Sequence, residues 1–187
     1  MWNGTIADCQ VSGHLDVTLD GSGKEGGLVG SERYGHIMNC ASRGNIIVNN
    51  APKAMVGGIL GEFNRTYGNI GLMFGIKHTT LTNCYSCGLI TTSGITDLSV
   101  GNISGVGQPK ASSGWFGPGM SYTVANCAYL NQGLERTVDS AIESLKGIDA
   151  ITDMKGDSMS NLLDTGEGKD QWIYDTDNLP FPKGKSN

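Results

Sequence analysis

The sequence Gly27-Leu28-Val29-Gly30 returns in related form as Gly58-Ile59-Leu60-Gly61, and Gly105-Val106-Gly107 is a shorter version of it. Each copy follows a second motif, in which an apolar residue, one further residue and then Asn or Asp precede a cysteine. The four copies of this second motif end at Cys9, Cys40, Cys84 and Cys127. The distance from the cysteine to the glycine motif is 18 residues in the first two copies and 21 in the third. A long period of this kind is the sequence signature of a solenoid.

Within each repeat, alternating apolar residues predict short strands. Leu15, Val17 and Leu19 alternate strictly, and Ile46 and Val48 match the first two in the next repeat. The glycine-rich stretch 20–26 is expected to be a loop. Cys9 and Cys40 lie 31 residues apart, a length that suits one coil of three short strands. We therefore expect an all-β fold over residues 1–136, a three-sided parallel β-helix (β-solenoid) of three to four coils.

Two insertions interrupt the repeats, near residues 62–79 and 108–121. The distance of 44 residues from Cys40 to Cys84, against 31 in the preceding repeat, reveals the first insertion. Insertions in a solenoid leave the stack on one face, where binding surfaces tend to be built.

Residues 137–187 have a different character. Val138, Ala141, Ile142 and Leu145 have helical spacing, Ser140 and Glu143 resemble a capping box, and a second helical piece is expected to end at Leu162 and Leu163. An open parallel edge must be covered. We expect a small helical and irregular C-terminal cap packed on the last coil.

Four of the five cysteines share one repeat position, which predicts a ladder of free cysteines in the core. Parallel neighbours lie about 4.8 Å apart with Cβ atoms pointing the same way, farther than the roughly 3.8 Å typical of a disulfide. Cys87 makes a Cys-x-x-Cys pattern with Cys84, but neither a helix start nor a second cysteine pair accompanies it. Hence we expect no metal and no redox chemistry there.

Asp8, Asn39, Asn83 and Asn126 form a second ladder, one residue before the cysteines. The favoured interpretation is a stack of side chains that satisfy turn backbone in successive coils. The alternative is a row of polar groups for a ligand or Ca²⁺.

Composition narrows the function classes. The 187 residues carry a net charge of −5, which argues against a nucleic-acid partner, and no apolar run is long enough to span a membrane. The first residues lack the charged and apolar regions of a signal peptide. We expect the chain to be part of a longer one whose signal peptide lies upstream.

The two full glycine motifs, with the repeated Asn-Cys and the glycine that follows it, resemble the GLUG-motif repeats of large secreted bacterial proteins, including Bacteroides surface proteins and IgA-specific metallopeptidases. Near the C-terminus, Met154-Lys155, Asn161 to Asp164, Trp172 and Leu179-Pro180-Phe181-Pro182 resemble the segment that often closes such arrays. The resemblance implies a parallel β-helix at the cell surface or outside the cell. It implies no reaction, and the sequence has no His-Glu-x-x-His motif of a metallopeptidase.

The candidate ligand-binding residues are the aromatic residues in or beside the insertions, which can stack on sugars or anchor a protein partner. They are Phe63, Tyr67, Phe74, Trp115 and Phe116. The alternative is that these side chains cover the flank of the solenoid as local core.

Catalysis on a β-helix needs clustered carboxylates on a strand face. The strands show only Asp8 and Asp16 in one coil, so we assign no catalytic residue, no cofactor and no metal. We expect a non-catalytic surface or secreted adhesion module that binds a glycan or a host extracellular protein. The alternatives are a carbohydrate-active β-helix enzyme and a purely structural stalk.

Overall fold

The structure is a computed structural model that describes residues 1, 4–32, 34–50, 53–63, 78–94, 97–106, 121–134 and 145–184. Strands make up 51% of it, the large sheets are parallel and helices are few, so the fold is all-β, as predicted. No helix among the described residues is both long and apolar enough to cross a membrane.

Each repeat contributes five short strands. In the first repeat they are β1 (Thr5–Ala7), β2 (Gln10–Val11), β3 (His14–Thr18), β4 (Ser22–Gly26) and β5 (Val29–Glu32). In the second they are β6 (His36–Met38), β7 (Ala41–Ser42), β8 (Asn45–Asn49), β9 (Lys53–Gly57) and β10 (Leu60–Phe63). In the third they are β11 (His78–Thr82), β12 (Tyr85–Ser86), β13 (Ile90–Ser93), β14 (Asp97–Gly101) and β15 (Ser104–Val106). A fourth repeat begins with β16 (Ser121–Ala125) and β17 (Cys127–Leu130), and β18 (Leu145–Ile148) follows it.

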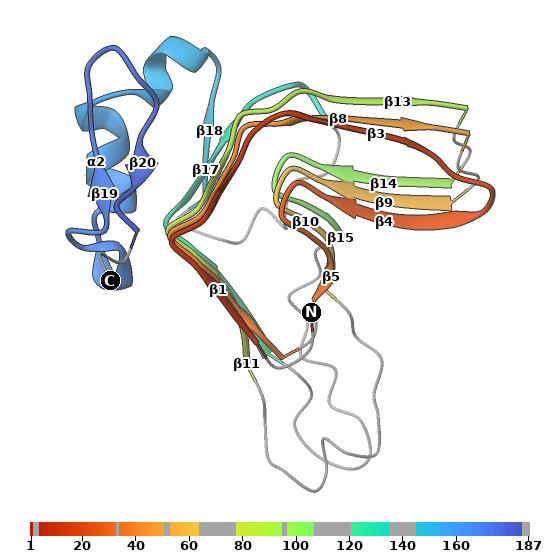
Figure 1. Cartoon of the computed structure of the whole chain (residues 1–187), viewed down its shortest axis with the longest axis horizontal. Coiled ribbons are helices and arrows are strands. Elements are labelled where there is room, and N and C mark those ends of the chain that lie inside the picture. Colours follow the sequence, from red (N-terminus) through yellow and green to blue (C-terminus); the bar gives the residue numbers. More distant parts are fainter. Residues whose placement is uncertain are drawn as a thin grey trace, which may run out of the picture.

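Every strand of the first two repeats pairs in parallel with its equivalent in the next repeat, so the repeats lie in layers, one upon another (Figure 1). The sheet orders are β1-β6-β11-β16, β18-β17-β12-β7-β2, β13-β8-β3, β14-β9-β4 and β15-β10-β5. The sheets of β3 and β4 run side by side and project as an arm (Figure 1). The register keeps like residues together: Ile6, Ile37, Leu81 and Val124 form one column.

The prediction of three strands per repeat was wrong, because two features of the sequence conceal strands. The Asp or Asn before each ladder cysteine breaks what looks like one strand into β1 and β2, or their equivalents. The stretch 20–26, expected as a loop, contains β4, whose five residues pair with Lys53–Gly57 of β9. Pairing with β9 supplies the hydrogen bonds of a segment whose own residues have weak strand propensity.

The interior between the stacked repeat strands divides into two parts, and a third core cluster lies under the residues that follow β17. One core cluster lies between the sheets of β1 and β5 and contains Ile37, Cys40, Leu60 and Leu81. The other fills the arm between the sheets of β3 and β4 and contains Ile46, Val48, Ala54, Val56, Ile90 and Val100. Because both run through all the layers, apolar burial holds the repeats together along the stack.

The register corrects the third glycine motif. Leu60 pairs with Val29 and with Ser104, so Gly61 is equivalent to Gly30 and to Gly105. The third copy is therefore Asn102-Ile103-Ser104-Gly105, not Gly105-Val106-Gly107. Its distance from Cys84 is 18 residues, as in the other repeats.

Gly61 of the motif and Gly57, just before the motif, must be glycine because backbone segments approach closely where the chain turns from β4, β9 or β14 into the next strand. A Cβ on Gly57 would lie 2.1 Å from the Leu60 carbonyl oxygen and 2.7 Å from the Gly105 nitrogen. A Cβ on Gly61 would lie 2.5 Å from the Gly30 carbonyl oxygen. No side chain larger than hydrogen fits these distances.

The C-terminal segment comprises β18 (Leu145–Ile148), η1 (Ile151–Met154), α2 (Asp157–Leu163), η2 (Gly166–Gly168), β19 (Trp172–Ile173) and β20 (Phe181–Pro182). The second predicted helical piece is confirmed as α2. Leu145 lies in a strand that extends the sheet of β17, because that edge offers hydrogen bonds, and not in the helix expected from its spacing. Residues 135–144, with the expected capping box, lie outside the described residues.

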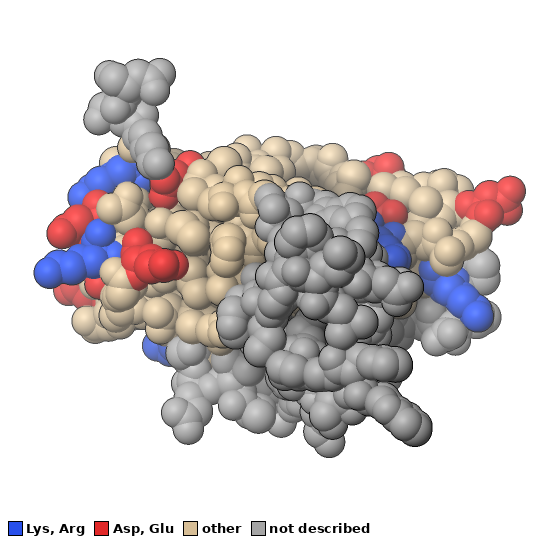
Figure 2. Space-filling model, turned by 90° about the horizontal axis from the view of Figure 1, so that it is seen from below, with Lys and Arg blue, Asp and Glu red and all other residues tan. Residues whose placement is uncertain are grey.

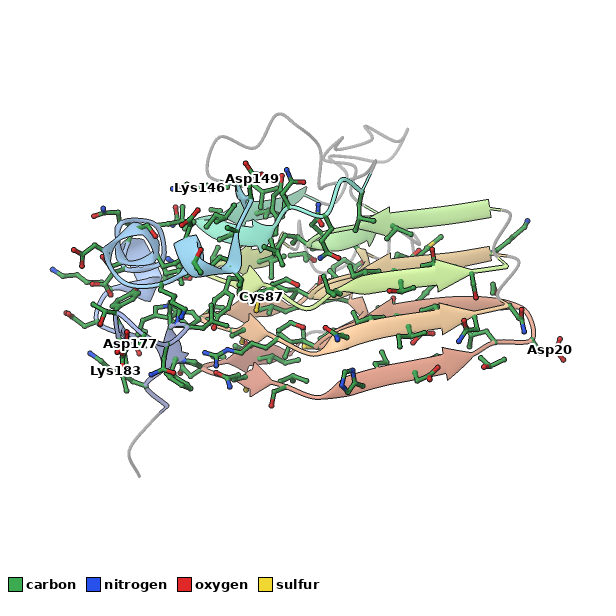
Figure 3. All side chains as sticks on the ribbon, turned by 90° about the horizontal axis from the view of Figure 1, so that it is seen from above. Asp20, Cys87, Lys146, Asp149, Asp177 and Lys183 are labelled. Carbon is green, nitrogen blue, oxygen red and sulfur yellow. The ribbon has the colours of Figure 1, made fainter. Side chains whose placement is uncertain are left out.

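Charged side chains are unevenly distributed. On the face shown in Figure 2, the described acidic and basic side chains gather at two ends, on the C-terminal segment and toward the tip of the arm. Asp20 marks the tip of the arm in Figure 3. The described surface between these ends is largely uncharged (Figure 2).

Candidate functional site

The two insertions join the same pair of sheets. Residues 64–77 connect the end of β10 to the start of β11, and residues 107–120 connect β15 to β16. Since β10 pairs with β15 and β11 pairs with β16, the attachment points of the two insertions are neighbours. In the first repeat only residues 33–35 make this connection. We call this region the insertion corner, defined by residues 31, 32, 34–36, 62–63, 78–80, 106 and 121.

A buried carboxylate lies at the insertion corner. Glu32 is 1% exposed, and its Oε1 accepts a hydrogen bond from the Gly35 N–H. Burial raises the pKa of Glu32 to about 7, although the Gly35 N–H opposes the rise by favouring the charged form. Thr79, from β11, also hydrogen-bonds this carboxylate. Glu32 therefore exchanges a proton near neutral pH.

A second carboxylate, that of Glu62, lies on the adjacent strand but on the opposite face of the sheet, because Glu62 is in register with Ser31 and not with Glu32. Glu62 Oε2 is 2.5 Å from Lys24 Nζ and accepts a hydrogen bond of 3.2 Å from Ser31 Oγ. Ser31 pairs with Glu62 across the sheet, and Glu32 pairs with Phe63 in the same way. The two carboxylates thus come from neighbouring strands and have different surroundings, one buried and one paired with a lysine.

The start of β6 and β11 adds hydroxyl and imidazole groups to this corner. His36 Nδ1 lies 2.8 Å from Thr80 Oγ1, and the Tyr34 N–H donates to Thr79 Oγ1 at 3.1 Å. These contacts link the second repeat to the third next to both insertions. Both contacts therefore hold the start of β11, where the first insertion ends, against the second repeat.

The predicted aromatic residues separate into two groups. Phe63 is 4% exposed and packs in the core cluster of Ile37 and Leu60, so its assignment as a ligand-binding residue was wrong. Its position at the end of β10 turns its ring inward, where burial of a large apolar side chain is favourable. Tyr67, Phe74, Trp115 and Phe116 lie outside the described residues.

The four ladder cysteines occupy equivalent positions, immediately before or at the start of the second strand of each repeat. Cys40, Cys84 and Cys127 are fully buried, whereas Cys9 in the first layer is exposed, and all five cysteines are free thiols. Burial raises the pKa of Cys84 well above its usual range, which keeps the thiol protonated and unreactive.

The Asp and Asn ladder lies at the corner between the first and second strands. All four residues have positive φ, 55° at Asp8, 52° at Asn39 and Asn83, and 54° at Asn126. Asn and Asp tolerate this left-handed conformation better than other non-glycine residues. Asn39 Nδ2 donates to Asp8 Oδ1 at 3.2 Å, which links two layers. Backbone geometry at a corner explains the residue type in each repeat.

Asn83 has an additional contact. Its Nδ2 donates to the carbonyl oxygens of Leu163 and Thr165, at 2.9 and 2.8 Å, and so binds the last turn of α2. The ladder thus also anchors the C-terminal segment at the third layer.

The C-terminal segment covers the outer face of the β2-β7-β12-β17-β18 sheet, a contact that sequence reasoning missed. Arg43 Nη2 donates to the carbonyl oxygens of Leu179 and Pro180, at 3.1 and 2.7 Å, and its guanidinium lies 4.5 Å from the centroid of the Phe181 ring. Tyr85 Oη donates to the Pro180 carbonyl oxygen at 2.7 Å.

The apolar part of the same face is buried under α2 and β19. Trp172 packs on Tyr85 with ring centroids 5.7 Å apart, and Cys87 lies 6% exposed beside them. Figure 3 shows Cys87 between the strands and the C-terminal segment. The sequence did contain a signal for this contact. An apolar residue follows three of the ladder cysteines, and strand alternation turns these residues to the outer face as an apolar row: Ala41, Tyr85 and Ala128.

No group of three or more His, Cys, Asp or Glu side chains arranged to hold a metal ion occurs in the described part of the chain. The Cys84 and Cys87 thiols face opposite sides of their sheet, since they belong to different core clusters. The described polar groups with the most distinctive chemistry are therefore the carboxylates, hydroxyls and imidazole of the insertion corner.

Comparison with protein-family models, with curated proteins and with solved structures found no match to this chain.

Proposed function

We propose that the chain is a parallel β-solenoid of three to four coils that serves as a non-catalytic binding module, secreted or at the cell surface. Its ligand is a glycan or a host extracellular protein, bound by the two insertions. The resemblance to GLUG-motif repeats supports the location. The parallel, in-register pairing of equivalent strands supports the solenoid.

One observation carries the binding proposal: the two insertions start and end on neighbouring strands. Each of the paired strands β10 and β15 runs into an insertion, and each of the paired strands β11 and β16 follows one. Parallel neighbours lie about 4.8 Å apart, so the two insertions begin and end one strand spacing from each other. The scaffold thus brings together the attachment points of two segments that residues 78–106 separate in the sequence.

The sequence of the insertions supplies side chains that suit a sugar or a protein partner. Tyr67, Phe74, Trp115 and Phe116 offer aromatic faces that stack on sugar rings or anchor a partner. The repeat residues themselves are already engaged, since the cysteines, the Asp and Asn ladder and the glycines form the core and the corners. A function for the module therefore belongs with the residues outside the repeat pattern.

Affinity electrophoresis tests this proposal. The purified protein is run through native gels that contain host or plant polysaccharides, beside the variant Trp115→Ala. Leu89→Ala is the matched control, because Leu89 is a large apolar side chain, 52% exposed, on the arm. Retardation that is lost in Trp115→Ala and kept in Leu89→Ala supports a glycan site on the insertions. No retardation on any gel rejects the glycan version and leaves a protein partner or a structural stalk.

A second candidate function is a carbohydrate-active enzyme, and Glu32 is the observation that favours it. A carboxyl group with a pKa near 7 suits a general acid, whereas the nearest carboxylate in sequence register, Glu62, faces the other side of the sheet. The test is release of reducing sugar from the same polysaccharides by the wild type and by Glu32→Gln. Release that falls by about 10² or more in the variant would favour the enzyme, whereas no release by the wild type removes this candidate.

A further inference from the structure

Glu32 connects the starts of two successive layers at the insertion corner. It is the last residue of β5, and its Oε1 accepts a hydrogen bond from the Gly35 N–H, immediately before β6. Thr79, on β11 in the third repeat, also hydrogen-bonds the carboxylate. The Thr80 N–H donates to the Gly35 carbonyl oxygen at 3.0 Å, and Thr80 pairs with His36. One side chain of the first repeat therefore contacts the beginning of both the second and the third.

The carboxyl group of Glu32 is buried with too few partners for a negative charge. The residue is 1% exposed, and its Oε2 has no hydrogen-bond partner among the described residues. An ionised carboxylate has lone pairs on both oxygens, and an incompletely paired charge in the interior costs far more free energy than a neutral carboxyl group there. Burial accordingly raises the pKa of Glu32 to about 7, so the group loses its proton near neutral pH.

The nearest charged group does not cause this rise. The Met1 ammonium, which donates to the Ser31 carbonyl oxygen, favours the ionised form of Glu32 and so lowers its pKa. The rise comes from burial and persists in spite of the ammonium. It therefore does not depend on an amino group at this point of the chain.

The other titratable groups on the elements around Glu32 are engaged elsewhere or face away. On β6, His36 Nδ1 lies 2.8 Å from Thr80 Oγ1. On β10, Phe63 is in register with Glu32, whereas the Glu62 carboxylate is on the opposite face of the sheet and pairs with Lys24.

Two segments complete these surroundings. In the connection between β5 and β6, the described titratable group is the Tyr34 phenol, which is buried. On β11, the described side chain that contacts Glu32 is the uncharged Thr79.

We propose that Glu32 is a pH-dependent switch of the insertion corner: uncharged, it holds Gly35 and Thr79 in the closed arrangement, and when it ionises it moves into water and releases the start of β11. Solvation of the ionised carboxylate requires that water reach Oε2, and Gly35 and Thr79 are the partners of the carboxylate that must then separate. The first insertion ends at β11, so its attachment is held at acid pH and released above neutral pH. This inference concerns the scaffold and is independent of the ligand that the insertions bind.

The direction follows from the proton that opening releases. The closed corner binds a proton with a pKa of about 7, and a solvated carboxyl group has the ordinary value of 4.5. The closed form is therefore fully favoured below about pH 4.5, and opening increases as the pH rises to about 7. From about pH 5 to about pH 8, the equilibrium constant for opening rises by about 50- to 100-fold.

Amide hydrogen exchange of the full chain, measured by nuclear magnetic resonance, tests the switch. Protection factors, corrected for the intrinsic effect of pH on exchange, report the opening equilibrium. Between about pH 5 and about pH 8, we expect protection of the Gly35 and Thr80 amides to fall by at least about tenfold. The Ile46 amide, which donates to the Leu89 carbonyl oxygen on the arm, should change by less than about twofold.

Two variants separate the switch from a general effect of pH. Glu32→Gln keeps the shape of the side chain but cannot ionise, so protection of Gly35 and Thr80 should be independent of pH. Glu62→Gln is the matched control, because it makes the same change on the opposite face of the adjacent strand, and it should retain the wild-type pH dependence. Equal protection at both pH values in the wild type overturns the proposal. So does an equal fall in Glu32→Gln, or a fall at Ile46 as large as that at Gly35.

A titration of the wild type covers the case in which Glu32→Gln misfolds. The side-chain carboxyl carbon of Glu32 and the amide of Thr79 should shift with one common midpoint, near pH 7. A carboxyl carbon that titrates near the ordinary value of 4.5, or a Thr79 amide that does not follow it, overturns the proposal.

Discussion

Gly57→Ala tests the physical reason for glycine at the position just before the motif Gly58-Ile59-Leu60-Gly61, where Gly26, Gly57 and Gly101 are in register. The new Cβ would lie 2.1 Å from the Leu60 carbonyl oxygen, 2.7 Å from the Gly105 nitrogen and 2.7 Å from the Ser104 Cα. Non-bonded heavy atoms pack at about 3.5 Å, so the backbone must move by about 1 Å or more. All three neighbours are backbone atoms, and two of them belong to the next layer. No side-chain rotation relieves the contact.

We expect Gly57→Ala to reduce the free energy of unfolding by about 3 kcal/mol, the upper part of the range for overpacking. For a chain of this size the loss corresponds to a fall in melting temperature of about 6–12 °C. Urea and thermal unfolding followed by circular dichroism measure it. Gly4→Ala is the control, because its Cβ meets only Met1 side-chain atoms at 3.4 and 3.5 Å, and we expect a change within about 0.5 kcal/mol. Equal effects of the two substitutions would refute the steric explanation.

Three further predictions follow from single groups. The pKa of Glu32 rises from 4.5 to about 7 on folding, so the folded state binds more protons and stability falls by about 3 kcal/mol as the pH rises through this window. Urea titrations from pH 4 to 8 should show this slope in the wild type and not in Glu32→Gln; the same slope in both variants would contradict it. Arg43→Met should weaken docking of residues 171–184 by about 2 kcal/mol. Amide hydrogen exchange of these residues should then be faster in the variant than in the wild type, by more than any change in β8. Unchanged exchange would exclude the role of Arg43. One thiol per chain, that of Cys9, should react rapidly with Ellman's reagent, and the buried Cys40, Cys84, Cys87 and Cys127 only on unfolding; several fast thiols would contradict the burial.

The repeat pattern predicted the layers well, for a physical reason. In a parallel stack every equivalent residue meets the same neighbours, so the same side chain is favoured in each layer. The ladder cysteines and the Asp and Asn corner are therefore visible in the sequence. The third glycine motif was misplaced because Asn102 and Ser104 replace a glycine and an apolar residue. Only the pairing of Leu60 with Ser104 reveals that they are equivalent.

Contacts outside the repeat pattern could not be predicted. β4 has the composition of a loop, and it becomes a strand because β9 offers it hydrogen bonds. The docking of the C-terminal segment depends on Arg43 and Tyr85. The equivalent positions in the other layers hold other residue types, so no repeated pattern marks these two residues. Phe63 was assigned to a binding surface by its nearness in sequence to an insertion. The strand that carries it turns its ring into the core.

The central claim is that equivalent residues of successive repeats lie in contact in parallel layers. Methyl–methyl nuclear Overhauser effects in protein labelled at Ile, Leu and Val test it most directly. The column of Ile6, Ile37, Leu81 and Val124 predicts cross-peaks from Ile6 to Ile37, from Ile37 to Leu81 and from Leu81 to Val124. It predicts none between Ile6 and Val124, which are three layers apart. Absence of the three sequential cross-peaks, or contacts of Ile37 with a different repeat position, would contradict the stacked architecture.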